Sequence, residues 1–346
     1  MTASGQGNPG QSTDVWTTRR LLGWTSDAFA RRGLDSPRLM AEVLLAHTIG
    51  CDRLRLYTDP DRPTPPPELA TLRALVARAL RHEPVQYLTG EAWFFGLPMH
   101  ADRRALIPRP CTELLVETVL QRFRLTTAPV PPAPVPPAPE PTEPTLSALP
   151  ADEPSHATPT PTPAAARRPQ QHAPALIADV CTGSGCVAVA IARHMPAARL
   201  VATDISPGAI ELARANAQRH GVGARVDLRT GDLLEPLADL AGSLDALLSN
   251  PPYIPNSEWG DVPPNVRDHE PELALRGGAD GLRFVLPVLR GAPRLLRPGG
   301  LLMIELAAAT AAQALAAATL TPGLTDPRVL KDLDGLDRVL TATRAG

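Results

Sequence analysis

The feature that most constrains the fold is a regular alternation of strand-length apolar runs and helical segments over residues 175–346. The apolar runs are Leu176–Cys181, Arg199–Asp204, Arg225–Arg229, Leu244–Asn250 and Gly300–Leu306. Helices are expected to begin at Cys186, Pro207, Gly281 and Ala308. Such alternation predicts an α/β fold in which helices cover both faces of a parallel sheet. Two further apolar runs around Asp334-Gly335 predict a terminal hairpin, which adds an antiparallel strand.

The tetrapeptide Asn250-Pro251-Pro252-Tyr253 follows the fourth apolar run directly. Because the prolines end the strand, Asn250 is expected at the carboxyl edge of the sheet, where open α/β sheets bind ligands. The Asn250 carboxamide oxygen and a proline carbonyl can each accept an N–H bond, and the Tyr253 ring offers an apolar wall. The tetrapeptide therefore indicates a site for a planar amino group. A proline-terminated loop after a core strand remains the alternative at this point.

A glycine-containing loop, Asp179 to Cys186, closes the first run and opens a helix. Its glycines let the backbone approach a ligand, and Asp204, at the end of the second run, can accept both hydroxyls of a ribose. The loop thus predicts a nucleoside-containing cofactor, and it also fits the dinucleotide pattern, so NAD is an alternative. Asp232 and Leu233 follow the third run and can bracket an adenine edge. Together with the amino-group site at Asn250, Asp232 and Leu233 favour S-adenosylmethionine over NAD as the cofactor.

Residues 15–83 have a helical pattern throughout, which predicts a small N-terminal α-helical bundle. The expected helices are Trp16–Arg32, Ser36–Ile49 and Pro67–His82, with Ser36 as an N-cap before Pro37. The segment contains no cluster of catalytic residue types. A bundle of this kind ahead of a catalytic domain typically recognises a partner.

The connection between the bundle and the α/β domain, residues 84–127, is predicted to be a short hairpin that turns near Gly96, followed by a helix over Thr112–Arg124 with Thr112 as its cap. Residues 128–174 contain 16 prolines in 47 residues and no aromatic residue, which predicts a disordered, polyproline-like insertion. Residues 1–14 are polar and are expected to form a disordered tail. They lack the apolar core of a secretion signal.

Charge and cysteine content exclude several classes of function. A formal charge of -2 gives no global footprint for binding nucleic acid. The four cysteines form no CxxC pairs and are accompanied by no histidine ladder, so no metal site is expected. The apolar stretch of residues 301–320 is interrupted by Glu305 and is better explained as a buried strand followed by a helix. A soluble, cytoplasmic protein that does not engage a membrane is expected.

At the level of longer motifs, the sequence resembles the release-factor glutamine-N5 methyltransferases, the PrmC/HemK family. The matching stretches cover nearly the whole chain apart from the tail and the proline-rich insertion. They are Glu83 to Gly90, Leu106 to Leu115, Asp179 to Gly185, Ser249 to Ile254, His269-Glu270-Pro271, Leu275, Gly277-Gly278, Asp280-Gly281-Leu282, Asp334-Gly335 and Asp337-Arg338.

The resemblance implies a seven-stranded, Rossmann-like class I methyltransferase domain behind a helical domain that recognises the release factor. It implies methylation of the glutamine in the release factor's Gly-Gly-Gln loop, with Asn250, Pro251, Pro252 and Tyr253 on that glutamine. The catalytic set is Asn250, Pro251 and Tyr253, and the residues assigned to S-adenosylmethionine are Asp179, Cys181, Thr182, Gly183, Ser184, Gly185, Asp204, Asp232, Leu233 and Asn250.

Three positions depart from the family pattern. Cys111 stands where the family usually has an acid, and Cys181 and Ala307 stand where it usually has glycine. Two alternatives to glutamine methylation follow from the residues: an amino-group methyltransferase acting on adenine or guanine of a nucleic acid, and a cofactor-binding scaffold that has lost catalysis. The first predicts a basic groove with a stacking platform, which the charge and the sparse aromatics do not indicate.

Overall fold

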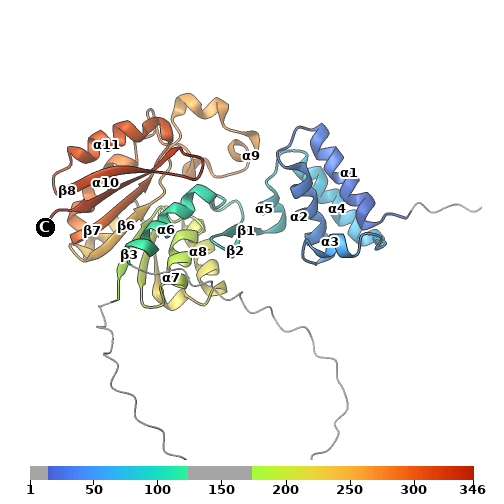
Figure 1. Ribbon diagram of the computed structural model, residues 1–346, viewed down its shortest axis with the longest axis horizontal. Helices are drawn as coiled ribbons and strands as arrows, with labels where there is room; N and C mark the ends of the chain where they lie inside the picture. The colour runs from blue at the N-terminus through green and yellow to red at the C-terminus, as the bar shows by residue number, and fades with distance from the viewer. Residues whose placement is uncertain (1–14, 124–173) are drawn as a thin grey trace, which may run out of the picture.

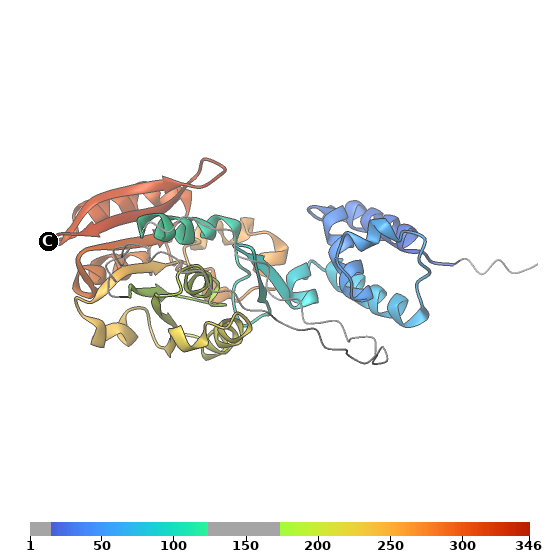
Figure 2. The same cartoon turned by 60° about the horizontal axis from the view of Figure 1, so that its bottom comes forward.

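The computed structural model describes residues 15–123 and 174–346. The expected tail of residues 1–14 and all but the last residue of the expected insertion at 128–174 lie outside the described residues. The described part contains a helical unit at the N-terminal side and an α/β unit, joined by a small hairpin (Figure 1). Figure 2 shows the helical unit standing clear of the sheet, with the hairpin between them.

The helical unit packs around one apolar cluster that includes Phe29, Leu44 and Leu72. Its helices are α1 Thr18–Arg31, α2 Pro37–Ile49, α3 Arg55–Thr58 and α4 Pro66–Ala79, with α5 Val85–Thr89 leading into the hairpin. Helices α3 and α5 were not expected, because single turns are too short to show a helical period.

Ser36 occupies the N-cap position before Pro37, as expected, but its side chain makes no capping hydrogen bond. Ser36 has a φ of 50° and its side chain caps nothing, while Pro37 occupies the first helical position. The residue before a proline is sterically restricted, and in the left-handed conformation the Ser36 hydroxyl makes no bond to the first turn. Gly50 ends the same helix with a φ of 73°, as expected for a C-terminal glycine.

The hairpin consists of β1 Glu91–Phe94 and β2 Leu97–His100, which pair antiparallel. Its two turn residues, Phe95 and Gly96, both have positive φ, which is the type I′ geometry of two-residue hairpin loops. The turn near Gly96 is therefore confirmed. Helix α6 Glu113–Arg122 follows, and the Glu113 carboxylate accepts a hydrogen bond from the Phe95 backbone N–H at 2.7 Å, which holds the turn against the helix.

The seven-stranded sheet has the order β5-β4-β3-β6-β7-β9-β8. Five strands are parallel, namely β3 Leu176–Val180, β4 Arg199–Asp204, β5 Val226–Thr230, β6 Leu244–Ser249 and β7 Leu296–Glu305, and β9 Asp337–Arg344 and β8 Leu324–Lys331 form the terminal antiparallel hairpin. Strand order reverses at β3, which lies between β4 and β6. Open α/β sheets bind ligands at the carboxyl ends of the strands at such a switch point.

Helices cover both faces of the sheet, as the alternation predicts. Alternate residues of β3 face opposite clusters: Ile177 packs with α6 and α7 Cys186–His194, whereas Ala178 packs with α10 Val285–Leu295 and α11 Ala311–Thr319. The remaining elements are α8 Pro207–Arg219, α9 Pro264–Arg267, and the 3-10 turns η1 Pro110–Thr112, η2 Gly223–Arg225, η3 Glu235–Leu240, η4 Asn256–Asp261, η5 Glu272–Ala274 and η6 Ala308–Thr310.

The starts of α10 and β7 each differ from the expectation by four residues. Helix α10 begins at Val285 rather than at Gly281, because Gly281 has a φ of 77° and lies so close to the Tyr253 carbonyl that a Cβ there would be 2.5 Å from its oxygen. Strand β7 begins four residues early, and the pairing of β6 with β7 shifts between Leu244 and Ala246. The α/β fold with a small helical bundle is confirmed. Within the described ranges, no helix is both long and apolar enough to cross a membrane.

Candidate active site

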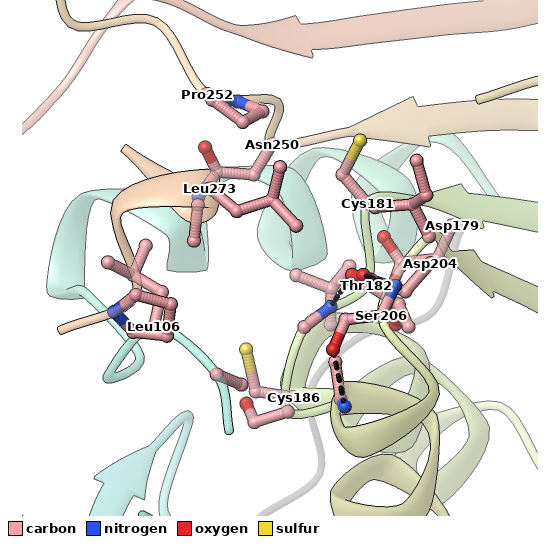
Figure 3. A pocket seen from close by; sticks show the side chains of 18 of the residues that line it. Leu106, Asp179, Cys181, Thr182, Cys186, Asp204, Ser206, Asn250, Pro252 and Leu273 are labelled. Atoms are coloured by element: carbon pink, nitrogen blue, oxygen red, sulfur yellow. Dashed lines mark hydrogen bonds between the residues drawn. The ribbon is translucent and has the colours of Figure 1, made fainter. Parts of the chain in front are cut away.

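A pocket lies at the carboxyl ends of β3, β4 and β6, at the switch point of the sheet (Figure 3). Its empty volume, with the open mouth included, is about 1070 Å³. Of the residues singled out from the sequence, those that line it are Asp179, Cys181, Thr182, Gly183, Ser184, Asp204, Asp232, Leu233, Asn250 and Pro252; Gly185, Pro251 and Tyr253 do not.

The loop between β3 and α7 is shaped by positive φ angles at Cys181, Gly183 and Gly185, of 61°, 55° and 77°. Cys181 therefore adopts a conformation that glycine tolerates far better. Gly185 serves packing between helices: a Cβ at this position would lie 2.8 Å from the Cβ of Ala213 on α8. The loop thus owes its path to close packing as well as to the pocket.

Asp179 fixes the β3–α7 loop through hydrogen bonds to its side chain. Its side chain is buried, and its Oδ2 accepts hydrogen bonds from the Thr182 hydroxyl at 2.6 Å and the Ala188 backbone N–H at 3.2 Å. Burial raises the pKa of this carboxyl to about 7, and the two donors oppose that effect. Asn216 of α8, which the sequence gave no reason to single out, donates to the Ser184 carbonyl at 2.9 Å and fixes the loop from the other side.

Asp204 stands at the end of β4 and faces the pocket. Its Oδ2 accepts from the Gly183 N–H and its Oδ1 from the Ser206 N–H, both at 2.9 Å. Burial raises its pKa, and these backbone donors oppose the rise. Each oxygen keeps a lone pair, so the carboxylate can still accept the two hydroxyls of a ribose. With the apolar side chains of Ile205 and Leu233 beside it and the Asp232 carboxylate nearby, the residues present fit a nucleoside cofactor.

Asn250 lies one residue beyond the end of β6, on the pocket wall. Its Nδ2 donates to the Thr112 hydroxyl at 3.1 Å, which leaves Oδ1 to accept a hydrogen bond from a ligand. Thr112 therefore does not cap α6 with its side chain, contrary to the expectation; it ends the turn η1 and holds Asn250 instead. Tyr253 lies behind the wall, where its hydroxyl donates to Oε1 of the buried Glu305 at 3.1 Å.

Two walls of the pocket were not expected from the sequence, residues 104–109 and the stretch from Pro271 to Ala274. Glu270 joins them: its side chain is fully buried, Oε2 accepts from the Ile107 N–H at 2.9 Å, and Oε1 forms an ion pair with Arg109. Both stretches overlap motifs noted above, to which no role in the pocket was assigned. Nothing in their spacing indicates that they meet, because 161 positions separate the paired residues.

Family models match the chain in two places, the PrmC N-terminal domain over residues 20–90 and the methyltransferase small domain over residues 168–261. A release factor glutamine methyltransferase from Geobacter sulfurreducens is 38% identical over 95% of this chain and 98% of its own length. The enzyme of the same name from Chlorobaculum tepidum is 38% identical over 94% and 97%. The chain belongs to the release factor glutamine methyltransferase family.

Among solved structures, a methyltransferase from Pyrococcus furiosus aligns with 51% of this chain and 79% of its own length at a TM-score of 0.38 and 17% identity. Membership of the release factor glutamine methyltransferase family makes the protein an enzyme that uses S-adenosylmethionine, and the pocket fits that cofactor. The sheet is accordingly the Rossmann-like sheet of class I methyltransferases, and methylation of nucleic acid is not favoured.

Proposed function

We propose that this protein methylates N5 of the glutamine side chain in the Gly-Gly-Gln motif of a peptide chain release factor. The names of the relatives support the release factor and its glutamine as the substrate. The observation that carries the proposal is the state of Asn250, which lines the pocket with Nδ2 engaged by Thr112 and Oδ1 left to accept a bond. Release factors act in translation, so the cytoplasm is the proposed place of action.

The cofactor is held along the carboxyl ends of β3, β4 and β5. The Asp204 carboxylate takes the ribose hydroxyls, while Asp232 and Leu233 border the adenine. Cys181 and Gly183 bring the loop backbone close to the ligand, and Asp179 and Gly185 act by shaping that loop. The full cofactor set is Asp179, Cys181, Thr182, Gly183, Ser184, Gly185, Asp204, Asp232, Leu233 and Asn250.

The acceptor is a poor nucleophile, because the lone pair of an amide nitrogen is delocalised into its carbonyl. Asn250 Oδ1 and the Pro251 carbonyl each accept one N–H bond from the glutamine amide, which turns its nitrogen toward the cofactor and favours its pyramidal form. When bound, S-adenosylmethionine supplies an electrophilic methyl group. No side chain has to remove a proton beforehand, since the nitrogen becomes acidic after methyl transfer. Pro252 lines the acceptor end of the pocket, and Tyr253 supports it from behind.

The helical unit, residues 15–83, is proposed to recognise the body of the release factor, and residues 84–127 to connect it to the methyltransferase unit at 175–346. No residue of the helical unit lines the pocket. Its surface carries large apolar side chains that its own core leaves uncovered, among them Trp24, Leu54 and Tyr57. Exposed aromatic and apolar side chains of this kind are common in protein interfaces.

The test is a label-transfer assay. The protein is incubated with methyl-labelled S-adenosylmethionine and, in parallel, with purified release factor, release factor in which the glutamine of the Gly-Gly-Gln motif is replaced by alanine, and total RNA and DNA. Label in the first sample alone supports the proposal. Label that persists on the alanine-substituted factor, or that appears in nucleic acid, contradicts it. Binding of the cofactor without transfer to any sample identifies a scaffold.

A further inference from the structure

A buried asparagine on α8 connects two segments of main chain that are far apart in the sequence. Asn216 is 0% exposed, and its Oδ1 accepts a hydrogen bond from the His100 backbone N–H at 2.7 Å. Its Nδ2 donates to the His100 carbonyl at 3.2 Å and to the Ser184 carbonyl at 2.9 Å. All three bonds go to backbone groups, so the side chain ties the end of β2 to the β3–α7 loop.

The partners of Asn216 leave its amide only one orientation. A backbone N–H can only donate, and a carbonyl can only accept. If the amide were turned over, its NH2 group would face the His100 N–H, and its oxygen would face the carbonyls of His100 and Ser184. The side chain would then lose all three bonds while fully buried, where an unsatisfied polar group is costly. The direction of the link is therefore fixed.

Both segments held by Asn216 lead into the cofactor pocket. Ser184 belongs to the β3–α7 loop and lines the pocket. His100 is the last residue of β2, and the chain runs on from it into residues 104–109, which form one wall of the pocket. Asn216 itself does not line the pocket. It thus acts from behind, by holding the loop and the start of that wall together.

The end of β2 also closes the hairpin from which the helical unit extends. The Ala101 N–H donates to the carbonyl of Gly90, the residue between α5 and β1, at 3.1 Å. Figure 1 shows the β1–β2 hairpin between α8 and the helical unit. Because Asn216 bonds to both the β3–α7 loop and the end of β2, the order of the loop and the order of the hairpin depend on each other.

We propose that Asn216 is a positioning residue that couples the binding of S-adenosylmethionine to the order of the β1–β2 hairpin. A cofactor that orders the β3–α7 loop also orders the end of β2 through the Ser184 carbonyl, and the ordering of one then lowers the entropy cost of the other. The coupling is reciprocal, so a loosened β2 weakens cofactor binding by the same factor. The inference concerns the cofactor alone and does not depend on the methyl acceptor proposed above.

Isothermal titration with S-adenosylmethionine compares the unmodified protein with Asn216→Leu and Asn216→Asp. Leucine has the branched shape of asparagine but no polar atom in its side chain. An ionised aspartate keeps an acceptor for the His100 N–H but cannot donate to the Ser184 carbonyl. We expect the dissociation constant to rise about 5- to 30-fold in both variants, the size set by leaving buried backbone groups unpaired. An unchanged dissociation constant in both variants would contradict the proposal.

Arg219→Ala is the matched control. Arg219 lies on the same helix and pairs with Glu91 of β1, so it also contacts the hairpin. Among the described residues, its side chain makes no hydrogen bond to the β3–α7 loop. The dissociation constant should therefore stay within about twofold of that of the unmodified protein, as expected for a partly exposed ion pair. Equal weakening in Arg219→Ala and Asn216→Leu would show that any loosening of the hairpin is enough, and would overturn the role of Asn216.

Amide hydrogen exchange provides a readout that a merely structural role would not move. In the unmodified protein, saturating S-adenosylmethionine should slow exchange of the His100 and Ala101 amides about 5- to 30-fold, by the same coupling. In Asn216→Leu with saturating cofactor, the slowing should be less than about twofold. Equal slowing in both proteins, or none in the unmodified protein, would overturn the inference. The second outcome is read on the unmodified protein, so the test holds even if the Asn216 variants fail to fold.

Discussion

Single residues determine the path of the β3–α7 loop, and Gly185 is the clearest case. It combines a φ of 77° with a position where a Cβ would lie 2.8 Å from Ala213 Cβ. We expect Gly185→Ala to lower the free energy of unfolding by roughly 1–3 kcal/mol, because it adds both backbone strain and overpacking. Denaturant unfolding measures the change. Gly260→Ala is the matched control, since Gly260 has open space around it and no positive φ, and equal losses in the two variants would refute this explanation.

The sequence allowed the individual site residues to be predicted only where they follow a strand directly. Asp204, Asp232 and Asn250 were found because each stands at or just beyond the end of an apolar run, and parallel strands end at the same edge of a sheet. The role of Thr112 could not be found in this way. As the residue before an amphipathic helix it has the pattern of an N-cap, and only its contact with Asn250, 138 positions away, shows what its hydroxyl does.

At the scale of elements, two loops close the pocket and Glu270 holds them together. The carboxylate is fully buried, whereas its partner Arg109 is 29% exposed. Removing the carboxylate in Glu270→Ala leaves the Ile107 N–H and Arg109 without their partner. We expect a loss of about 2–3 kcal/mol in the free energy of unfolding. This is at the low end of the usual cost of breaking a buried ion pair, or below it, because the Arg109 side chain can reorient and be solvated by water.

A second effect of Glu270→Ala should be weaker cofactor binding, because residues 104–109 line the pocket together with Pro271, Leu273 and Ala274. Isothermal titration with S-adenosylmethionine measures it. Glu272→Ala serves as the control: Glu272 lies two residues away and pairs with Arg276, but it is 63% exposed, so its loss should cost less than about 1 kcal/mol. Similar behaviour of the two variants would show that Glu270 does not hold the walls.

The elements themselves were largely predictable, and their errors have physical causes. Strands β3 to β6 were placed to within one residue, since each is an apolar run bounded by turn residues. The predicted start of β7 is too late because Pro298-Gly299-Gly300 suggests a turn. In the structure these residues belong to the strand, in a part where its pairing with β6 is irregular. The predicted start of α10 is too early because Gly281 packs against the backbone of the Asn-Pro-Pro-Tyr loop. The spacing of residues in the sequence cannot reveal this contact.

At the scale of the whole molecule, a small polar junction joins the helical unit to the methyltransferase unit. Arg103 donates to Glu83, which Arg78 also holds, and to His269 Nδ1 at 3.2 Å; the His269 ring in turn contacts the Arg81 carbonyl. Paired with these arginines, the Glu83 carboxyl has a pKa lowered to about 2, so the ion pairs persist at neutral pH. The junction thus sets the angle between the unit proposed to bind the release factor and the pocket.

We therefore expect Arg103→Ala to raise the KM for intact release factor by about 3- to 10-fold. Without this contact the two units spend less time in the relative orientation that lets both bind the factor at once. The KM and kcat for a short peptide containing Gly-Gly-Gln should stay unchanged, since such a peptide reaches only the pocket. Steady-state kinetics with both substrates measures the difference. An equal loss with peptide and with intact factor would place the effect in the pocket and contradict the role of the junction.

The central claim is that Asn250 presents a glutamine side-chain amide to S-adenosylmethionine, and one measurement tests it most directly. Release factor is incubated with cofactor and either the unmodified protein or Asn250→Ala, and tandem mass spectrometry locates the added methyl group. The account predicts a single methyl on the side-chain nitrogen of the Gly-Gly-Gln glutamine. It also predicts a rate about 100- to 1000-fold lower for Asn250→Ala, with cofactor affinity affected much less than the rate. A methyl group on another residue, or full activity of Asn250→Ala, would contradict it.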